Sequence, residues 1–546
     1  MIDLWYKNAV IYALDVGTFA DSNGDGIGDF QGLCNQLPYL AGIGITCVWL
    51  LPFYPSPQRD HGYDITDYYG VDPRYGTLGD FVDFMRQADE LGIRVIVDLV
   101  VNHTSNEHVW FQSARSSPDS PFRDWYVWSK DKPREAESGI VFPGVQKTTW
   151  TFDRKASAYY FHRFYDFQPD LNVSNPAVRE EIERIMGFWI QLGVTGFRID
   201  AAPFIIEDKG VREPMGPEQY GWLTDFRRFL SWRRGDAIML AEANVPPKNV
   251  LNFFGTGDRM NLLFNFWANM HLFLAVAQED ATILRKTFQQ LPPLPATAQW
   301  ANFLRNHDEI DLGRLADDER ELCFRAFAPE PDMQLYGRGI RRRLAPMLQG
   351  DRRRMELMNS LLFTLPATPV IRYGEEIGMG DFLELPERES IRTPMQWSTG
   401  ANGGFSSAER RKLIRPVVDS GEYRYERINV AAQRLDPDSF LNWTERAIRA
   451  RKECPEFGWG EMKFLETDHP AVLAHACSWR GGTVAAVHNF SRATTTVNVK
   501  WPAGTKQLLH LYGRRVQDPL PVETGVLDLD GYDYRWLRLD GATASD

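Results

Sequence analysis

The sequence lacks the features of a secreted, disulfide-linked or membrane-spanning protein. Its 546 residues include five cysteines, which are scattered, odd in number and without a C-x-x-C pair. Neither a disulfide framework nor a zinc site is therefore predicted. No run of eighteen apolar residues occurs, and the N-terminus has no basic start followed by an apolar stretch. We expect a cytoplasmic protein that does not cross a membrane.

Basic residues are also fewer than acidic residues. The chain has 61 Lys and Arg residues against 73 Asp and Glu residues, which gives a formal net charge of −12. This balance disfavours general affinity for nucleic acid or an anionic membrane and favours a neutral substrate. Two arginine runs, at 341–343 and 352–354, are expected to be solvated helix faces, as most charge runs are.

Short apolar runs recur along the chain, and the segments between them are long enough to hold helices. This alternation predicts an α/β fold, a (β/α)₈ barrel, with the active site where the strands end. The eight runs are residues 10–14, 47–51, 95–100, 196–200, 238–241, 262–266, 300–304 and 369–373.

Three departures from this alternation indicate further parts. About seventy residues separate the third run from the fourth, too many for one connection. After about residue 455 the pattern changes to alternating strands with Gly, Pro and Asp turns, typical of an antiparallel β-sandwich. Residues 311–360 form a long, lid-like excursion from the barrel. We predict a barrel formed by residues 1–103 and 178–454, an inserted domain at residues 104–177, and a terminal sandwich at residues 455–546.

Three acidic residues, Asp200, Glu242 and Asp308, come at or just after the ends of strand-like runs. Hydrolysis or transfer of a glycoside with retention needs a carboxylate nucleophile and a second carboxyl group that acts as acid and then as base. A single Asp is more often a helix cap or a surface ion-pair partner. Three carboxylates at strand ends favour an active site.

Four segments in order, 98–103, 196–200, 241–244 and 305–308, resemble the conserved motifs of the α-amylase superfamily, glycoside hydrolase family 13. The resemblance covers nearly the whole chain and implies that Asp200 is the nucleophile, Glu242 the acid/base and Asp308 the transition-state stabiliser. Arg198 points to the same side of its strand as Asp200, so we expect it to lower the pKa of Asp200. Glu242 must begin protonated, so we expect less positive charge around it and a raised pKa.

The resemblance also implies a sugar pocket. The segments 59–65 and 392–397 are similar to those of the α-glucosidase and trehalose synthase branch, in which Asp60 and Arg392 would pair to close the pocket and Tyr63 would stack under the sugar ring. A closed pocket implies exo action on small sugars. The predicted substrate-binding residues are Asp60, Tyr63, His103, Gln168, Arg198, His307, Glu309 and Arg392.

The strings at 50–57, 162–165, 168–172 and 339–346 look like trehalose synthases, which interconvert maltose and trehalose. This implies an intramolecular transfer through a β-glucosyl ester on Asp200, under a lid that excludes water. Two segments, 244–247 and 383–391, depart from that branch and are expected to touch the acceptor half of the site. An α-glucosidase, with α-1,4 preference suggested by Ala201, and a non-catalytic sugar-binding relative remain alternatives. A homodimer stays open.

Residues 21–29 place oxygen ligands at positions 1, 3, 5 and 9 with glycine at position 6, as calcium loops do. Position 12 is Gly32, so a helix-loop-helix site is disfavoured, but the superfamily has a similar loop after its first strand. A structural Ca²⁺ and no organic cofactor are expected. The ligands of this site would be Asp21, Asn23, Asp25, Ile27 and Asp29. The resemblance implies a second site formed by Asn102, Asp170, Phe204, Ile205 and Glu207.

Overall fold

Eight parallel strands close into a barrel in the computed structural model, which describes residues 3–209, 219–514 and 525–542. Strand β1 pairs with both β2 and β14, so the sheet has no open edge. The fold confirms the predicted (β/α)₈ barrel, and each strand overlaps one of the eight predicted runs, with β3, β10 and β14 beginning one residue earlier than predicted. The barrel strands are β1 (Ile11–Leu14), β2 (Cys47–Leu50), β3 (Arg94–Leu99), β7 (Gly196–Ile199), β8 (Ile238–Ala241), β9 (Leu262–Phe264), β10 (Gln299–Phe303) and β14 (Thr368–Arg372).

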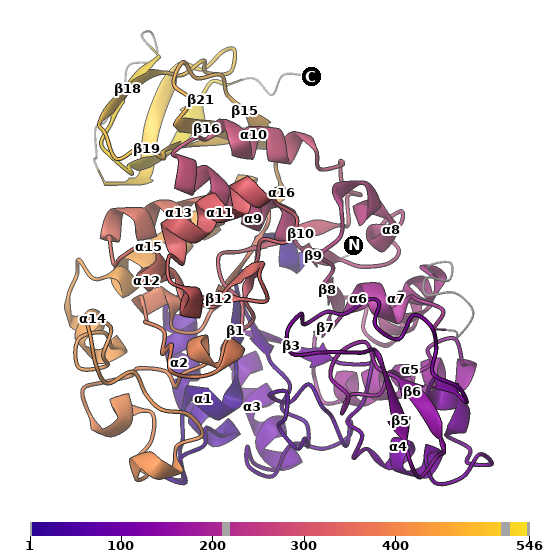
Figure 1. Ribbon diagram of the computed structural model, residues 1–546. Coiled ribbons are helices and arrows are strands. Elements are labelled where there is room, and N and C mark those ends of the chain that lie inside the picture. The colour runs from indigo at the N-terminus through magenta and orange to yellow at the C-terminus, as the bar shows by residue number, and fades with distance from the viewer. Residues whose placement is uncertain (1–2, 210–218, 515–524, 543–546) are drawn as a thin grey trace.

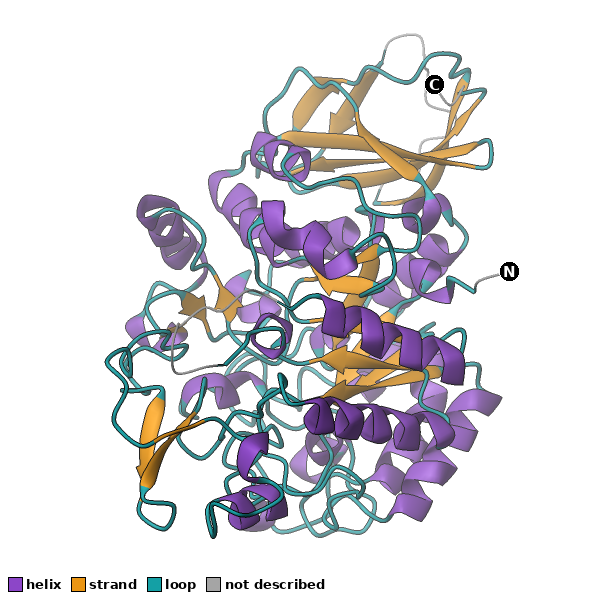
Figure 2. Ribbon diagram, turned by 90° about the vertical axis from the view of Figure 1, so that its right-hand side faces the viewer, coloured by secondary structure: helices purple, strands orange, loops and turns teal. Residues whose placement is uncertain are grey.

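Helices surround the barrel, as Figure 2 shows by the purple ribbons around the orange strands. The strands are buried almost throughout, because helices cover their outer face and side chains fill their inner face. Local sequence sets the helix starts: Thr77 and Asp80 form a capping box on α3, and Asn175 caps α5 ahead of Pro176. The longer helices are α2 (Phe30–Gly42), α3 (Leu78–Glu90), α5 (Pro176–Gln191), α7 (Gly221–Arg233), α9 (Phe266–Gln278), α10 (Thr282–Gln289), α11 (Asp317–Phe327), α13 (Arg352–Thr364) and α15 (Phe440–Lys452).

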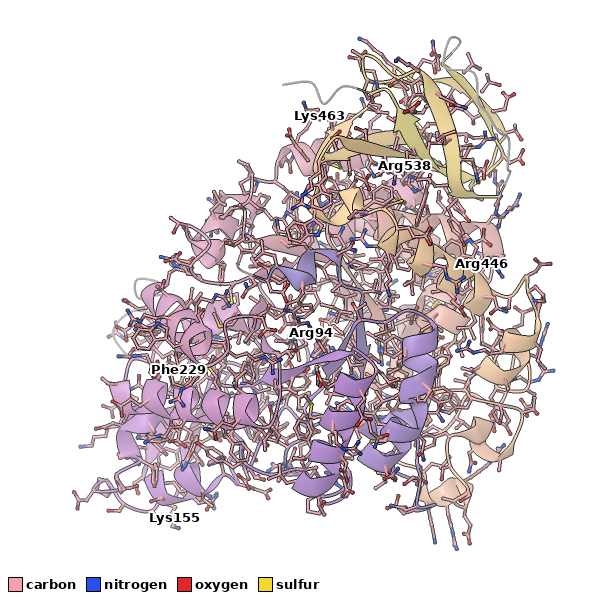
Figure 3. All side chains as sticks on the ribbon, turned by 180° about the vertical axis from the view of Figure 1, so that it is seen from behind. Arg94, Lys155, Phe229, Arg446, Lys463 and Arg538 are labelled. Carbon is pink, nitrogen blue, oxygen red and sulfur yellow. The ribbon has the colours of Figure 1, made fainter. Side chains whose placement is uncertain are left out.

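Alternate residues of each strand serve two cores. Ile11 and Ala13 point into a cluster inside the barrel, whereas Tyr12 and Leu14 pack against the helices. The same period of two places Arg198 and Asp200 on one side of β7. The amino end of the barrel, where β3 begins, carries ion pairs of Arg94 with Asp3 and Asp236, and Figure 3 labels Arg94. The predicted carboxylates Asp200, Glu242 and Asp308 line a cavity at the opposite, carboxyl end of the strands.

A three-stranded sheet lies between β3 and α5, within the predicted segment 104–177. It consists of β4 (Trp128–Ser129), β6 (Ala158–Phe161) and β5 (Trp150–Asp153). The lid-like excursion holds a second small sheet of β11 (Ile310–Asp311), β13 (Gly339–Ile340) and β12 (Gln334–Leu335), followed by the short α12 (Leu344–Met347).

The C-terminal strands form antiparallel sheets of five and two strands that share one hydrophobic cluster, as predicted for a sandwich. In Figure 1 they lie together at the yellow end of the chain, and Figure 3 marks them by Lys463 and Arg538. The exact residue boundaries of the three domains stay predictions. The strands are β15 (Glu461–Phe464), β16 (Val472–Trp479), β17 (Gly482–Asn489), β18 (Thr495–Asn498), β19 (Gln507–Gly513), β20 (Val526–Leu529) and β21 (Tyr534–Asp540).

One sequence expectation fails here. The arginine run 341–343 is not a solvated helix face: it follows β13, and Arg343 is fully buried with its guanidinium on Glu375 at 3.0 Å. Arg341 is also buried and donates to the carbonyls of Leu383 and Leu385.

The described helices include none long and apolar enough to cross a membrane.

Candidate active site

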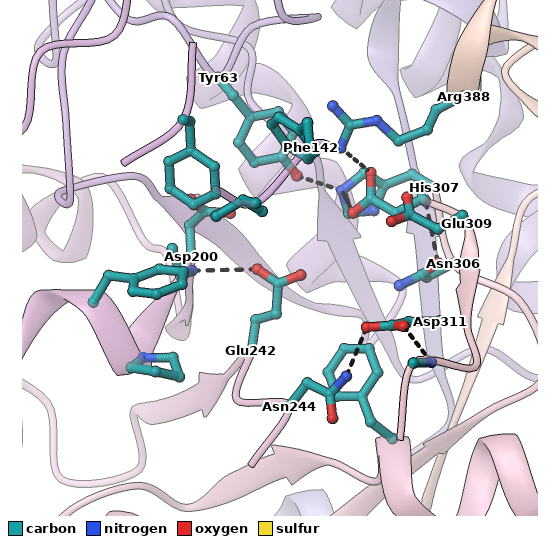
Figure 4. Close-up of a pocket in the computed structure, with 18 of the residues that line it drawn as sticks. Tyr63, Phe142, Asp200, Glu242, Asn244, Asn306, His307, Glu309, Asp311 and Arg388 are labelled. Carbon is teal, nitrogen blue, oxygen red and sulfur yellow. Dashed lines mark hydrogen bonds and ion pairs between the residues drawn. The ribbon is translucent and has the colours of Figure 1, made fainter. Parts of the chain in front are cut away.

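The three predicted catalytic carboxylates line one cavity of about 600 Å³ at the carboxyl end of the barrel (Figure 4). Asp200 follows β7, Glu242 follows β8, and Asp308 lies in the loop after β10. Parallel strands that close into a barrel bring their carboxyl ends together, so residues far apart in the sequence meet here. Their catalytic roles stay predictions, but their common location agrees with them.

Arg198 lies between the carboxyl groups at the centre of the site. Its guanidinium lies 2.5 Å from Asp98, 2.6 Å from Asp200 and 2.9 Å from Glu242, and only 1% of its side chain is exposed. The single positive charge thus faces three carboxyl groups. At least one proton is therefore favoured among the three, because like charges so close disfavour full ionisation.

Arg198 lowers the pKa of Asp200 as expected, but burial outweighs it, so the net direction is upward. Burial raises the pKa of Asp200 to about 7, and Arg198 only opposes that rise. Burial likewise raises the pKa of Glu242 to about 7, against the effect of Arg198. The expectation of a raised value for Glu242 agrees in direction, but not because positive charge is absent, since Arg198 contacts both residues.

Asp308 is held in its ionised form by two other guanidiniums and by the His307 imidazole, which is neutral because burial keeps the pKa of His307 well below its ordinary value. Arg388 and Arg392 each lie 2.8 Å from its Oδ1, and His307 Nε2 lies 3.1 Å from its Oδ2. Burial would raise the pKa of Asp308, but His307 and the two guanidiniums outweigh burial and hold it well below the ordinary value. A fixed anion near the sugar can stabilise the positive charge of an oxocarbenium-like transition state.

The pairing predicted to close the sugar pocket involves a different arginine. Asp60 forms its ion pair with Arg388 at 3.2 Å, whereas Arg392 is bound to Asp308 and to the carbonyl of His307. Gln168 donates to the other oxygen of Asp60 at 2.9 Å. Arg388 thus bridges Asp60 and Asp308 and forms the end wall, while Arg392 lies behind it.

The aromatic and imidazole rings predicted to bind the sugar lie in the wall of the cavity. Tyr63, His103 and His307 all line the cavity. The ring of Tyr63 stacks on that of His307 at 5.5 Å, with its hydroxyl 2.7 Å from His307 Nε2. Glu309 also lines the cavity, whereas Arg198, Gln168 and Arg392 support it from behind. The structure therefore brings all eight predicted substrate-binding residues to this site, five of them into the wall.

Several wall residues were missed by the sequence reasoning. Arg388 lies in the divergent segment 383–391 and stacks over Phe142 of the inserted domain, with 5.1 Å between guanidinium and ring. The sequence could have indicated Arg388 as a partner for Asp60, because it lies only four residues before Arg392. Phe142 gave none, because aromatic residues are frequent throughout this chain.

A polar network surrounds the mouth of the cavity. Asn244 donates to Asp311 at 2.9 Å, and Arg314 donates to the side chain and backbone of Asn244 at 2.9 and 2.5 Å. Arg338 lies 3.3 Å from Asp311 and donates to the carbonyl of Val141. The excursion after β10 is thereby connected to the acid/base loop and to the inserted domain, as expected of a lid.

The predicted calcium loop is built from turns in which side-chain oxygens accept from the backbone. Asp21, Asn23 and Asp25 each accept from an N–H two residues ahead, and Asp21 also accepts from Ser406. Asp29 caps α2 at Gly32. The single side-chain oxygen of Asn23 is used in its turn, whereas Asp25 is exposed and uses one of its two oxygens in this way, which fits a calcium loop in donor chemistry. Among the described residues, no group of three or more His, Cys, Asp or Glu side chains is arranged so that it could hold a metal ion.

The second predicted metal site does not fit a metal, because an ammonium group lies in it. Lys209 Nζ is 2.5 Å from Asn102 Oδ1 and 2.6 Å from Asp170 Oδ2. Glu207 instead binds Arg163 at 2.5 Å. Both side chains of the Lys209–Asp170 pair are 1% exposed or less. The oxygens of Asn102, Asp170 and Glu207 are thus bound by cations of the chain itself.

Comparisons with known proteins show which family this chain resembles. A sequence model of the α-amylase catalytic domain matches residues 15–327 and 341–460, and one of the sucrose hydrolase-like C-terminal domain matches 481–538. A trehalose synthase of Thermus thermophilus is 45% identical over 496 residues, which are 90% of this chain and 51% of that protein, so this chain spans about half of it. The trehalose synthase/amylase TreS of Mycobacterium tuberculosis H37Rv is 40% identical over 543 residues, 98% of this chain and 90% of that protein.

Solved structures resemble the whole fold. The trehalulose synthase MutB from Pseudomonas mesoacidophila MX-45 superposes with a TM-score of 0.78 at 25% identity, covering 98% of this chain and 99% of that one. The isomaltulose synthase SmuA from Protaminobacter rubrum gives a TM-score of 0.79 at 25% identity, with the same coverage.

Proposed function

We propose, from the premise that this chain belongs to the α-amylase family and to its trehalose synthase branch, that it interconverts maltose and trehalose by retaining glucosyl transfer. The observation that carries this proposal is the position of Asp200 and Glu242 on one buried guanidinium, inside a cavity whose far end is closed by Asp60 and Arg388. A closed end accommodates the non-reducing glucose and admits no longer chain beyond it.

The reaction divides into two displacements. Glu242 gives its proton to the glycosidic oxygen while an oxygen of Asp200 attacks the anomeric carbon, so the C–O bond breaks, glucose is released and a β-glucosyl ester forms. The released glucose turns, and its anomeric hydroxyl attacks the anomeric carbon of the glucosyl ester while the Glu242 carboxylate takes the proton. Asp200 leaves as a carboxylate, and the two inversions give overall retention.

The charges around the donor pocket support this sequence of steps. Asp308 stays ionised beside Arg388 and Arg392, so its negative charge is available when the anomeric centre becomes positive. Asp200 and Glu242 have pKa values near 7, so one proton between them at neutral pH supplies both an acid and a nucleophile.

The mouth network supports transfer to glucose over transfer to water. Asn244, Asp311, Arg314 and Arg338 connect the lid to the acid/base loop and the inserted domain. A lid held at several points keeps the freed glucose in place and excludes water during its turn. The cavity of about 600 Å³ is of the size that holds a small ligand.

Two further properties belong to this proposal. We propose a structural Ca²⁺ on the loop of Asp21, Asn23, Asp25, Ile27 and Asp29, far from any role in the reaction. A cytoplasmic location is supported by the five cysteines, which are all free thiols and all buried. A homodimer stays a prediction.

The deciding experiment is incubation of the purified protein with maltose, followed by NMR of trehalose and glucose. Mostly trehalose is expected. Mostly glucose would instead identify an α-glucosidase, and no turnover would overturn an enzymatic role. Asp200→Ala should abolish turnover because the ester cannot form, whereas the exposed-residue control Asp225→Ala should behave as the parent.

A further inference from the structure

Two residues next to the end wall of the sugar pocket contact each other outside the cavity. Asp60 and Arg388, which form that wall, line the cavity (Figure 4), whereas their direct neighbours His61 and Glu389 do not. The Nε2 atom of His61 lies 3.1 Å from Oε1 of Glu389. The two segments are thus joined at adjacent residues, once in the wall at 3.2 Å and once behind it.

The backbone of the loop that carries Asp60 explains why His61 lies outside the pocket. His61 and Gly62 both have left-handed backbone, with φ of 52° and 94°. A Cβ atom at Gly62 would lie 2.8 Å from the carbonyl oxygen of Pro52, so only glycine fits there. These two residues turn the chain so that Asp60 and Tyr63 both line the cavity while His61 does not. A left-handed residue other than glycine persists where its surroundings fix it.

His61 and Glu389 meet as a neutral imidazole and an ionised carboxylate. The Nδ1 atom of His61 is buried without a hydrogen-bond partner among the described residues, so a proton there would have no acceptor. Burial lowers the pKa of His61 to about 3, and Arg392 adds to the shift. The imidazole therefore donates its Nε2–H to Glu389, and this hydrogen bond lowers the pKa of Glu389.

A buried arginine anchors Glu389 to the barrel. The Nε atom of Arg415 lies 3.8 Å from Oε2 of Glu389, and its Nη1 atom lies 3.7 Å from Oδ2 of Asp15. Asp15 directly follows β1 and caps α1 (Val16–Phe19) by accepting from the N–H of Gly17. The Glu389 carboxylate is thus held between the loop that carries Asp60 and the start of the barrel.

The position of Arg388 depends on how its segment is oriented. Arg388 lies in a short 3₁₀ helix, Glu387–Ile391, and its guanidinium bridges Asp60 and Asp308. The loop that carries Asp60 is fixed on its own, because Asp64 accepts from the N–H of Asp60 at 3.1 Å. A single contact between a short helix and a fixed loop lets the helix pivot, whereas a second contact at the adjacent residue sets its orientation.

We propose that His61 and Glu389 are positioning residues that hold the end wall of the sugar pocket closed and so determine its exo specificity. This role rests on the proposed function, because the pocket concerned is the one that would hold the non-reducing glucose. With the pair intact, Arg388 stays on Asp60 and excludes any group attached beyond that glucose. Without it, the short helix pivots and the pocket opens at its closed end.

The first test measures sugar binding without turnover, by calorimetric titration with 1-deoxynojirimycin, an imino sugar of the shape of glucose. His61→Leu should weaken binding about tenfold, because it loses a charge-assisted hydrogen bond that holds the wall. His61→Gln, which can place an N–H near the position of Nε2, should recover most of the affinity. Arg59→Ala is the matched control, since it breaks an exposed ion pair with Glu107 on the same loop, and should bind as the parent does. Equal affinity of His61→Leu and the parent would overturn the proposal.

Kinetics on maltose separate positioning from catalysis. Glu389→Ala removes the same contact from the other side, and the two side chains are 18% and 30% exposed, so both variants should fold. Each should raise KM about tenfold with kcat changed less than about twofold, because the wall contacts the sugar alike in the ground and transition states. The double variant His61→Leu, Glu389→Ala should be no worse than the weaker single one, since one contact is lost in all three. A fall in kcat at unchanged KM would contradict a positioning role.

A blocked substrate tests the specificity. The substrate is p-nitrophenyl α-maltoside with an ethylidene group across O4 and O6 of its non-reducing glucose. The parent and His61→Gln should leave it intact, whereas His61→Leu should cleave it measurably. Exclusion of this substrate by His61→Leu would overturn the role in specificity. Because the binding test needs no turnover, a parent that binds the imino sugar but leaves maltose unchanged would refute the proposed reaction alone.

Discussion

Removal of the Lys209 ammonium tests whether a cation of the chain replaces the metal predicted beside the inserted domain. Lys209 contacts Asn102 and Asp170, and the Lys209 and Asp170 side chains are 1% and 0% exposed. Lys209→Ala leaves the Asp170 carboxylate buried without its main partner. Breaking a buried pair in this way costs about 3–5 kcal/mol.

The assay is thermal unfolding combined with hydrogen exchange of the peptides that contain Asn102 and Asp170. The variant should melt about 5 °C or more below the parent, given the cost of the broken pair. Faster exchange should be confined to these peptides, since His103 and Asp170 form a bridge between the barrel and the inserted domain. Lys155→Ala, which removes an exposed lysine of the inserted domain (Figure 3), is the matched control and should change stability by less than about 0.5 kcal/mol.

Calcium provides the refuting comparison. In the Lys209→Ala variant the oxygens of Asn102 and Asp170 become free to bind a divalent cation, so millimolar calcium should restore part of the lost stability. The parent protein should show no such gain from this site, because the ammonium occupies it. A variant that melts with the parent would refute the reasoning, since the buried carboxylate would then need no cation.

The other predictions concern the active site and the calcium loop. The rate of trehalose formation plotted against pH should be a narrow bell-shaped curve with its maximum near pH 7. The rate falls at higher pH because Glu242, the proposed acid, loses its proton, and at lower pH because Asp200, the proposed nucleophile, gains one. A broad plateau in this curve would contradict pKa values of about 7 for both residues. Arg388→Ala should lower kcat/KM about 100-fold or more because Asp60 and Asp308 lose their shared cation, whereas Arg388→Lys should recover part of it. Asn244→Ala should loosen the lid and raise the ratio of glucose to trehalose about threefold or more, measured by NMR, with little change in maltose consumption. Removal of calcium by a chelator should lower the melting temperature of the parent, and an unchanged value would count against the Asp21 loop.

The barrel and its carboxylates were predictable because both depend on short-range patterns. Each strand is a run of three to six mostly apolar residues, and parallel strands that alternate with helices close in one favoured way. Asp200, Glu242 and Asp308 follow directly from that topology, since residues at strand ends meet at one end of the barrel. Arg198 was predictable as a neighbour of Asp200 for the same reason, by the two-residue period of β7.

Partners that come from distant segments were not predictable in this way. Arg388 and Arg392 are four residues apart in the sequence, yet Arg388 reaches Asp60 while Arg392 reaches the backbone of His307. The pKa of Asp200 depends on its burial with Asp98 and Glu242 around one guanidinium, and no local pattern gives that burial.

The sequence by itself determined the family, the barrel and the positions of the three candidate carboxylates, because strand periodicity and motif order are properties of neighbouring residues. Only the tertiary structure decided which cation meets which carboxylate. Lys209 lies where a metal was expected, and Arg343 lies in the protein interior where a solvated face was expected. The physical reason is that a long cationic side chain can reach several partners from one backbone position, and the packing of the surrounding elements selects among them.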